Sequence, residues 1–154
     1  MPRARRPGDL HPACAQRPFR YLAAGNQLSA EAENQRHAGR HAGAEIVAAL
    51  APLPGDVVIK KHRYDAFHNT QLETVLRNIR GAGRVDTVII IGTVTSICCE
   101  STARSAFMRD YKVAFISDAN GGLDEASHNA TLDIIGKVFG RVMTVAELGN
   151  LLRS

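Results

Sequence analysis

The stretch VDTVIIIGTVTSICCESTARSAF, residues 85–107, decides the fold. It opens with a continuous run rich in β-branched residues, which is typical of a strand buried on both faces of a parallel sheet. After Gly92 the pattern becomes helical, and two adjacent cysteines, Cys98 and Cys99, stand at the change. Glycine permits a sharp turn there because its backbone adopts shapes closed to other residues. The stretch therefore predicts a strand, a tight turn and a helix, with Cys98 near the first helical turn.

The flanking segments continue this alternation. We expect strands at 57–61, 112–119 and 140–144, and helices at 44–52, 70–83, 98–111, 124–138 and 145–152. Thr144 and Glu147 have the spacing of a capping box for the last helix. Strands that alternate with helices predict a parallel sheet with helices on its faces. The predicted fold class is therefore α/β, a three-layer α/β/α arrangement with a parallel, Rossmann-like sheet.

Residues 1–42 differ from the rest of the chain. They contain no Val and no Ile, four of the six prolines, and seven arginines against three acidic residues. Such a segment has little to bury, gives no strong strand or helix signal, and rules out a buried central strand. We therefore divide the chain into an irregular basic segment, 1–42, which we expect to be disordered or loosely packed, and a domain, 43–154.

Composition narrows the classes of function. No apolar run approaches the roughly 20 residues that span a bilayer, and no signal-peptide stretch is present. Three cysteines, with two adjacent, form a poor disulfide framework, so reduced thiols in a cytoplasmic protein fit better. The N-terminal arginines form no helical stripe, which disfavours a nucleic-acid-binding arm. We predict no membrane partner and no nucleic-acid partner.

The two cysteines have different expected roles. Ligands bind at the carboxyl ends of parallel strands, and the predicted turn places Cys98 at that edge. A helix start favours a thiolate, and its N–H groups could stabilise an oxyanion. Cys98 is therefore a candidate nucleophile, and the alternative is an inert buried thiol. Cys99 points about 100° further round the helix, which indicates packing.

A second candidate site lies in IKKHRYDAFHNT, residues 59–70. A strand that ends in Lys60 and Lys61 would bring a cation to the same sheet edge, where it could hold a thiolate. The alternative is a solvated lysine pair. His62 and His68 have no partner at metal-ligand spacing, so we expect no metal and no cofactor.

Two further polar residues have structural expectations. His128 lies within a predicted helix, where a structural role is expected. Asp118 ends a predicted strand, where a turn or a cap is the expected role.

Two motifs together resemble the isochorismatase-like cysteine hydrolases. GTVTSICCESTARSAF, residues 92–107, is similar to the family's G-x-x-T-x-x-C-V-x-x-T-A-x-x-A pattern, with Cys99 replacing the usual valine. KHRYDAF, residues 61–67, is similar to the family's K-x-x-Y-[SD]-[AG]-F motif. DTVIIIG, DYKVAFISDA and RVMTVAEL also match in order and spacing, so the resemblance covers 43–154. Its ureide and carbamoyl amide hydrolases are the most similar branch.

The resemblance implies a mechanism. Cys98 would be the nucleophile and Lys61 the catalytic lysine, and the backbone N–H groups of Thr95 and Cys98 would form the oxyanion hole. A cis peptide bond is expected before that threonine, at Val94–Thr95. Cys98 would attack a small amide or ureide, and water would hydrolyse the resulting thioester. The resemblance also implies a homo-oligomer, a dimer or a tetramer.

One part of the family pattern is missing. The family begins with an apolar strand that ends in an aspartate, its general base, and nothing in 1–42 matches it. Asp9 has no such strand around it and does not receive the role. Our hypothesis is that this chain is the C-terminal portion of a hydrolase behind a wrong start or a shifted reading frame. Its hydrolytic activity would then be weak. The alternatives are an inactive relative that serves as a binding or oligomerisation module and, less favoured, isochorismate-type ether hydrolysis. A zinc-assisted nicotinamidase is disfavoured because we identify no Asp-x-His metal site.

Overall fold

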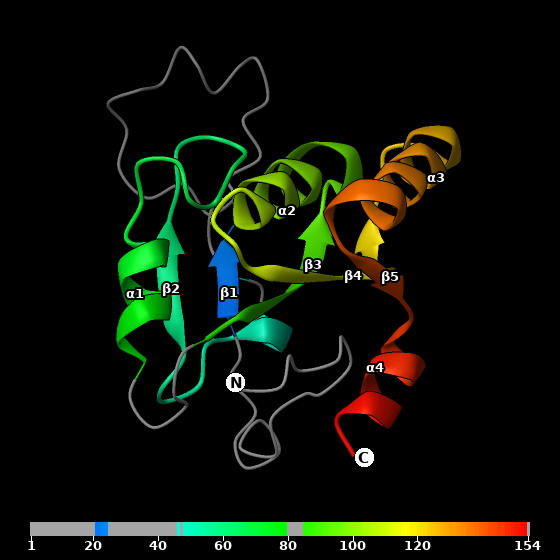
Figure 1. Ribbon diagram of the computed structural model, residues 1–154. Coiled ribbons are helices and arrows are strands. Elements are labelled where there is room, and N and C mark those ends of the chain that lie inside the picture. The colour runs from blue at the N-terminus through cyan, green and yellow to red at the C-terminus, as the bar shows by residue number, and fades with distance from the viewer. Residues whose placement is uncertain (1–20, 25–45, 47, 80–84, 154) are drawn as a thin grey trace, which may run out of the picture.

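The computed structural model describes residues 21–24, 46, 48–79 and 85–153, and these form an α/β fold with parallel strands flanked by helices (Figure 1). This arrangement confirms the predicted fold class. The described elements are β1 (Tyr21–Ala24), a 3₁₀ turn (Ala48–Leu50), β2 (Val57–Lys60), α1 (Leu72–Asn78), β3 (Thr87–Thr93), a π-helical turn (Thr95–Cys99), α2 (Glu100–Phe107), β4 (Lys112–Gly121), α3 (Glu125–Ile134), a second π-helical turn (Ile135–Phe139), β5 (Arg141–Met143) and α4 (Val145–Leu151).

The strands pair in parallel within two sheets. One sheet contains β1 and β2, and the other has the order β3-β4-β5. The pairing of β3 with β4 is regular as far as Ile90 and Phe115 and then shifts, so that Gly92 lies opposite Asn120. The irregular pairing therefore lies directly before the turn that carries the cysteines.

The two faces of the three-stranded sheet belong to different cores. On one face, Val113 and Phe115 of β4 pack with α1, α2 and the second π-helical turn. On the other face, Ala114 and Ile116 pack with Met143 of β5 and with residues of α4. This alternation follows from the two-residue period of a strand. Figure 1 shows α4 apart from α2 and α3, and the cysteine turn belongs to the first core.

Strand β3 corrects one prediction, because it is not buried on both faces. Val88 and Ile90 pack against the first core, but Ile89 is 46% exposed and Ile91 is 54% exposed. Ile89 lies opposite Ala114 of β4, which packs in the same core as residues of α4. The residues that cover this face of the sheet therefore reach β4 and leave β3 exposed. A continuous apolar run shows that a strand is compatible with burial on two faces, but it does not show whether both are covered.

Strand β1 corrects a second prediction. Residues 21–24 form a strand within the segment 1–42, where we expected none, and Leu22 lies opposite Val58 of β2. Strand formation depends on a partner for the backbone N–H and C=O groups, and β-branched content is only a weak guide to it. Asp9 lies outside the described residues.

The helices at 124–138 and 145–152 end within two residues of their predicted ends. The other three predicted helices are shorter than expected: α1 ends at Asn78, with Ile79 already extended, and α2 ends at Phe107. The helix expected at 44–52 is reduced to the 3₁₀ turn, although residues 44, 45 and 47 lie outside the described part. The predicted capping box of α4 is confirmed, since Thr144 and Glu147 each accept the other's backbone N–H. In the described ranges, no helix has both the length and the apolar character that a membrane span requires.

Candidate active site

The chain turns sharply between β3 and α2. Gly92 has a φ of 136°, which only glycine adopts readily, and the peptide bond between Thr93 and Val94 is cis. The predicted turn at Gly92 is confirmed. The predicted position of the cis bond, Val94–Thr95, is wrong by one residue. The cis bond follows the last residue of β3 directly, and Thr95 already begins the π-helical turn.

Backbone hydrogen bonds close the turn around its first residues. The N–H groups of Ile97 and Cys99 both donate to the Val94 carbonyl, at 3.1 and 3.2 Å. The N–H of Glu100 donates to the carbonyls of Thr95 and Ile97. Cys98 therefore lies in a π-helical segment immediately before α2, a local geometry that occurs frequently at functional sites.

The adjacent cysteines occupy different environments. Cys99 is 5% exposed, belongs to the first core and faces Gly92, where an added Cβ would lie 3.8 Å from its sulfur. Burial and the neighbouring Cys98 raise the pKa of Cys99 to about 12, although the charge of Lys61 opposes the shift. Cys98 is only half-buried. Cys99 is thus a neutral packing residue near neutral pH, as the sequence predicted, and Cys98 is the thiol that reagents can reach.

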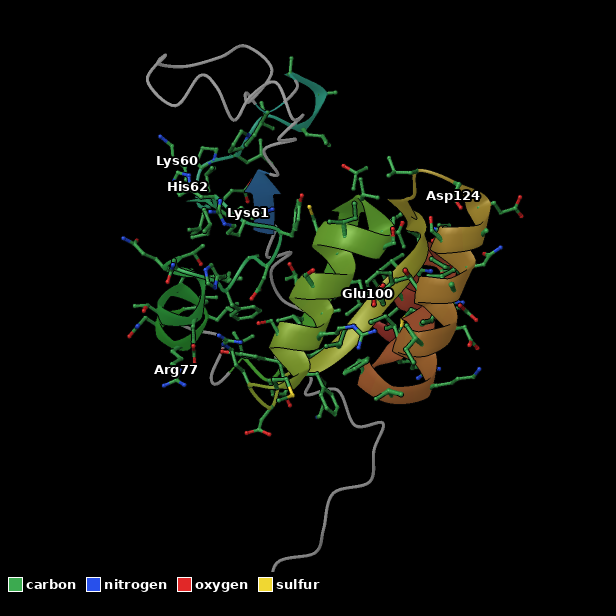
Figure 2. The ribbon with its side chains drawn as sticks, turned by 90° about the horizontal axis from the view of Figure 1, so that it is seen from above. Lys60, Lys61, His62, Arg77, Glu100 and Asp124 are labelled. Atoms are coloured by element: carbon green, nitrogen blue, oxygen red, sulfur yellow. The ribbon has the colours of Figure 1, made fainter. Side chains whose placement is uncertain are left out.

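The two lysines at the end of β2 also lie in different environments. Lys61 is 8% exposed, whereas Lys60 is exposed. The Lys61 ammonium donates to the carbonyls of Arg63 and Tyr64, at 3.1 and 3.2 Å. Figure 2 shows Lys61 on the side of the loop that faces α2. Because the charge of Lys61 acts on the pKa of Cys99, the lysine loop and the cysteine turn are electrostatic neighbours.

Helix α3 braces the cysteine turn at both ends. The Thr95 hydroxyl, fully buried, lies 2.9 Å from Nδ1 of His128. The Thr131 hydroxyl, 2% exposed, donates to the Glu100 carboxylate at 2.8 Å. His128 and Thr131 are three residues apart and so share one face of α3. The predicted structural role of His128 is confirmed, whereas the sequence analysis did not identify the contact between Thr131 and Glu100.

A polar network docks the lysine loop on α2. The Asp65 carboxylate accepts from the Phe67 N–H at 2.8 Å and from the Ser105 hydroxyl at 2.7 Å. Arg109 donates to the same hydroxyl at 2.7 Å, which links its charge to that of Asp65. These contacts connect residues about 40 positions apart, so the lysine position depends on the same helix that follows Cys98.

Other predicted residues have roles outside the candidate site. Asp118 accepts the N–H of Val145 at 2.8 Å, so it caps the start of α4 and confirms its expected role. His62 and His68 are exposed loop residues. Among the described residues, no group of three His, Cys, Asp or Glu side chains is arranged to hold a metal ion.

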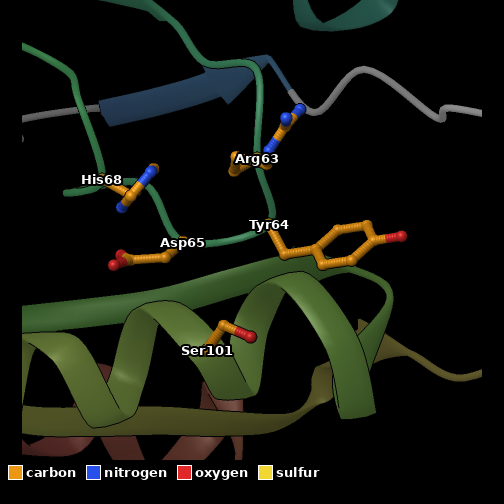
Figure 3. A pocket seen from close by; sticks show the side chains of 5 residues that line it. All are labelled: Arg63, Tyr64, Asp65, His68 and Ser101. Atoms are coloured by element: carbon orange, nitrogen blue, oxygen red, sulfur yellow. The ribbon is translucent and has the colours of Figure 1, made fainter. Parts of the chain in front are cut away.

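A hollow of about 290 Å³ lies between the lysine loop and α2 (Figure 3). The loop contributes Arg63, Tyr64, Asp65 and His68, and the helix contributes Ser101. Ser101 follows Cys98 by three positions, which places the two residues on nearby parts of the same helical surface. The hollow therefore lies between the lysine loop and the first turn of α2, which directly follows the cysteine turn.

The pattern of the isochorismatase domain matches residues 13–147. The chain belongs to the isochorismatase family. The resemblance that the two motifs predicted is therefore confirmed, and the family match begins well before residue 43, where we placed the start of the resemblance.

Curated members of the family similar to this chain include amide hydrolases. The ureidoacrylate amidohydrolase RutB of Methylobacterium radiotolerans is 40% identical over 108 residues, which cover 70% of this chain and 40% of that protein. Nicotinamidase 3 of Arabidopsis thaliana is 42% identical over 77 residues, which cover 50% of this chain and 37% of that protein. The chain thus spans less than half the length of these two relatives.

Solved structures of the family have the same fold. A cysteine hydrolase from Pseudomonas syringae pv. phaseolicola matches with a TM-score of 0.66 and 41% identity, covering 72% of this chain and 55% of that chain. The isochorismatase fold therefore extends over most of the chain.

Proposed function

We propose that this chain carries the cysteine and the lysine of a hydrolase that cleaves a C–N bond in a small amide or ureide. One observation carries the proposal. The charge of the buried Lys61 ammonium acts on the pKa of Cys99, and the turn that holds Cys99 leaves the neighbouring thiol, Cys98, half-buried. A buried cation beside an accessible thiol is the environment that activates a cysteine nucleophile.

The proposed reaction begins at Cys98. Its thiolate attacks the carbonyl carbon, and the new oxyanion accepts hydrogen bonds from the backbone N–H groups of Thr95 and Cys98. The C–N bond then breaks, and the nitrogen leaves with a proton as amine or ammonia. Water attacks the thioester, releases the acid or carbamate and restores the thiol. Lys61 stabilises the negative charge that develops in both steps.

The lack of a general base among the described residues limits the proposed rate. In the described part of the chain, no carboxylate hydrogen-bonds to Cys98 or to Lys61, since Asp65 and Glu100 are engaged with other partners. General-base assistance typically contributes about 10²- to 10⁴-fold to a rate. We therefore propose slow turnover, supported by the thiol and the lysine alone.

A second candidate function rests on the open face of β3. Ile89 and Ile91 expose apolar surface beside a covered part of the same sheet, and Val58 of β2, in the other sheet, is 44% exposed. Exposed apolar patches often mark protein interfaces. An inactive relative that acts as an oligomerisation module, or an active dimer or tetramer, would bury this surface.

Ammonia release tests the first proposal. The full chain is incubated with a panel of small ureides and primary amides, and Cys98→Ala serves as the matched variant. Slow release that requires Cys98 supports a hydrolase. Release that persists in Cys98→Ala, or no release by a folded protein from any compound, overturns it and leaves the oligomerisation module.

A further inference from the structure

The hollow beside the lysine loop has a defined relation to the proposed reacting groups. The carbonyls of Arg63 and Tyr64 hold the Lys61 ammonium, so the backbone of these two lining residues is fixed around the lysine. On the opposite side, Ser101 belongs to the first turn of α2, directly after the cysteine turn. A molecule in the hollow therefore lies between the lysine loop and the first turn of α2, which directly follows the cysteine turn (Figure 3).

The negative charge that lines the hollow is already engaged. Asp65 accepts the Phe67 N–H with one carboxylate oxygen and the Ser105 hydroxyl with the other. Arg109 donates to Ser105 at 2.7 Å, so the charge of Asp65 is balanced through that hydroxyl from the side of α2. Asp65 thus serves to dock the loop on the helix and offers little to a cationic ligand.

Arg63, the arginine that lines the hollow, has N–H groups that donate no hydrogen bond to the described residues. Arg63 is exposed and uses Nη1 to donate to the His62 carbonyl at 2.9 Å. A guanidinium has five N–H donors, and among the described residues no carboxylate forms an ion pair with Arg63. The planar guanidinium matches the geometry of a carboxylate and binds it through two parallel hydrogen bonds.

We propose that Arg63 is a specificity residue that selects substrates with a carboxylate, so that the hydrolase prefers an anionic amide or ureide to a neutral one. The inference rests on the proposed function for the identity of the reacting group. The carboxylate pairs with the free side of the Arg63 guanidinium, and the remainder of the ligand lies across the hollow toward Cys98. Attraction between the two charges then orients the carbonyl carbon for attack.

Two alkylating reagents of nearly equal size test this selection without any need for turnover. Iodoacetate is anionic and iodoacetamide is neutral, and both transfer a carboxymethyl-type group to a thiolate with loss of iodide. The full chain is treated with each reagent at neutral pH and low salt, and fragment mass spectrometry measures the label on Cys98. The observable is the ratio of the two rate constants.

Three variants locate the effect. Arg63→Gln is expected to lower the iodoacetate-to-iodoacetamide ratio by about 3- to 5-fold, as expected for an exposed ion pair. Arg63→Lys is expected to restore much of the ratio, and the effect of Arg63 is expected to shrink with added salt. The matched control Arg77→Gln removes an equal charge from α1 and is expected to leave the ratio unchanged, because Arg77 pairs with Glu73 on a helix that does not line the hollow.

The outcomes separate this inference from the proposed function. An equal ratio in the unchanged protein and in Arg63→Gln overturns the inference even if ammonia release shows a working hydrolase. An equal drop in Arg63→Gln and Arg77→Gln overturns it too, since the effect is then one of overall charge. Absence of label on Cys98 in the folded protein also contradicts it, because the hollow must lead to that thiol. A selective drop in Arg63→Gln supports it even if the chain releases no ammonia.

Discussion

The cysteine turn and the lysine loop each contain two identical neighbouring residues, and each region separates its pair in a different way. In the turn, the first cysteine is accessible and Cys99 enters the core, with its pKa raised to about 12. In the loop, Lys60 is exposed and Lys61 is buried, with its ammonium capped by two carbonyls. A thiol that is to react must be reachable, whereas a cation that is to act on it gains strength from burial, because exclusion of water reduces screening. Each pair therefore supplies its own internal control.

The largest effect is expected at the lysines. Lys61→Met removes a preorganised positive charge, so ammonia release should fall by about 10²- to 10³-fold, the loss typical of one such stabilising donor. Lys60→Met removes the same charge one residue earlier, on the exposed side, and should leave the rate within about twofold, as surface substitutions usually do. Initial rates with a ureide substrate measure both. Comparable losses in the two variants would contradict the separation of the pair.

An intermediate effect is expected at the brace of the cysteine turn. Thr95→Val removes the hydroxyl that contacts His128 and leaves a part-buried ring nitrogen without that partner. The free energy of unfolding should drop by about 1–3 kcal/mol. Thr87→Val, at the half-buried start of β3, removes a hydroxyl that contacts only the exposed side chain of Asp86 and should cost less than about 0.5 kcal/mol.

Urea titrations of the Thr95 and Thr87 variants measure this difference. The slope of the unfolding free energy against urea should stay constant, so that the shift in midpoint reports stability. Similar midpoints for both variants would show that α3 does not brace the turn.

The last effect concerns pH. Folding raises the pKa of Cys99 from 9.0 to about 12 because burial disfavours the thiolate. The unfolded chain therefore loses this proton first, and the stabilisation that is complete below pH 9 declines as pH rises from about 9 toward about 12. In Cys99→Ala this part of the decline should disappear, while the cost of the smaller side chain stays independent of pH.

Stability measurements between pH 8 and pH 11 on the unchanged protein and on Cys99→Ala check this expectation. Parallel curves over that window would mean that the Cys99 thiol is not held neutral by the core.

Local patterns in the sequence predicted local structure well. The capping box of α4 involves Thr144 and Glu147, three residues apart, and both of its hydrogen bonds form. The positive φ of Gly92 likewise follows from its place at the end of a strand, just before the turn. These features depend on a few neighbouring residues, so the sequence contains the information that determines them.

Features that depend on distant partners were missed. The contact of Thr95 with His128 joins residues 33 positions apart, and no periodicity reveals it. The exposure of Ile89 and Ile91 depends on where α4 ends its cover, and the strand at 21–24 depends on its pairing with β2. Such features are properties of tertiary packing, which overrides local propensity.

The role of Cys98 is tested most directly by trapping the acyl group. The full chain is mixed with a ureide or amide that it hydrolyses, quenched in acid, and analysed by intact and fragment mass spectrometry. We expect a transient mass increase equal to the acyl part of the substrate, located on Cys98 and absent from Cys98→Ala. An adduct on Cys99, or turnover in which no adduct forms on either thiol, would contradict a nucleophilic Cys98 beside an inert Cys99.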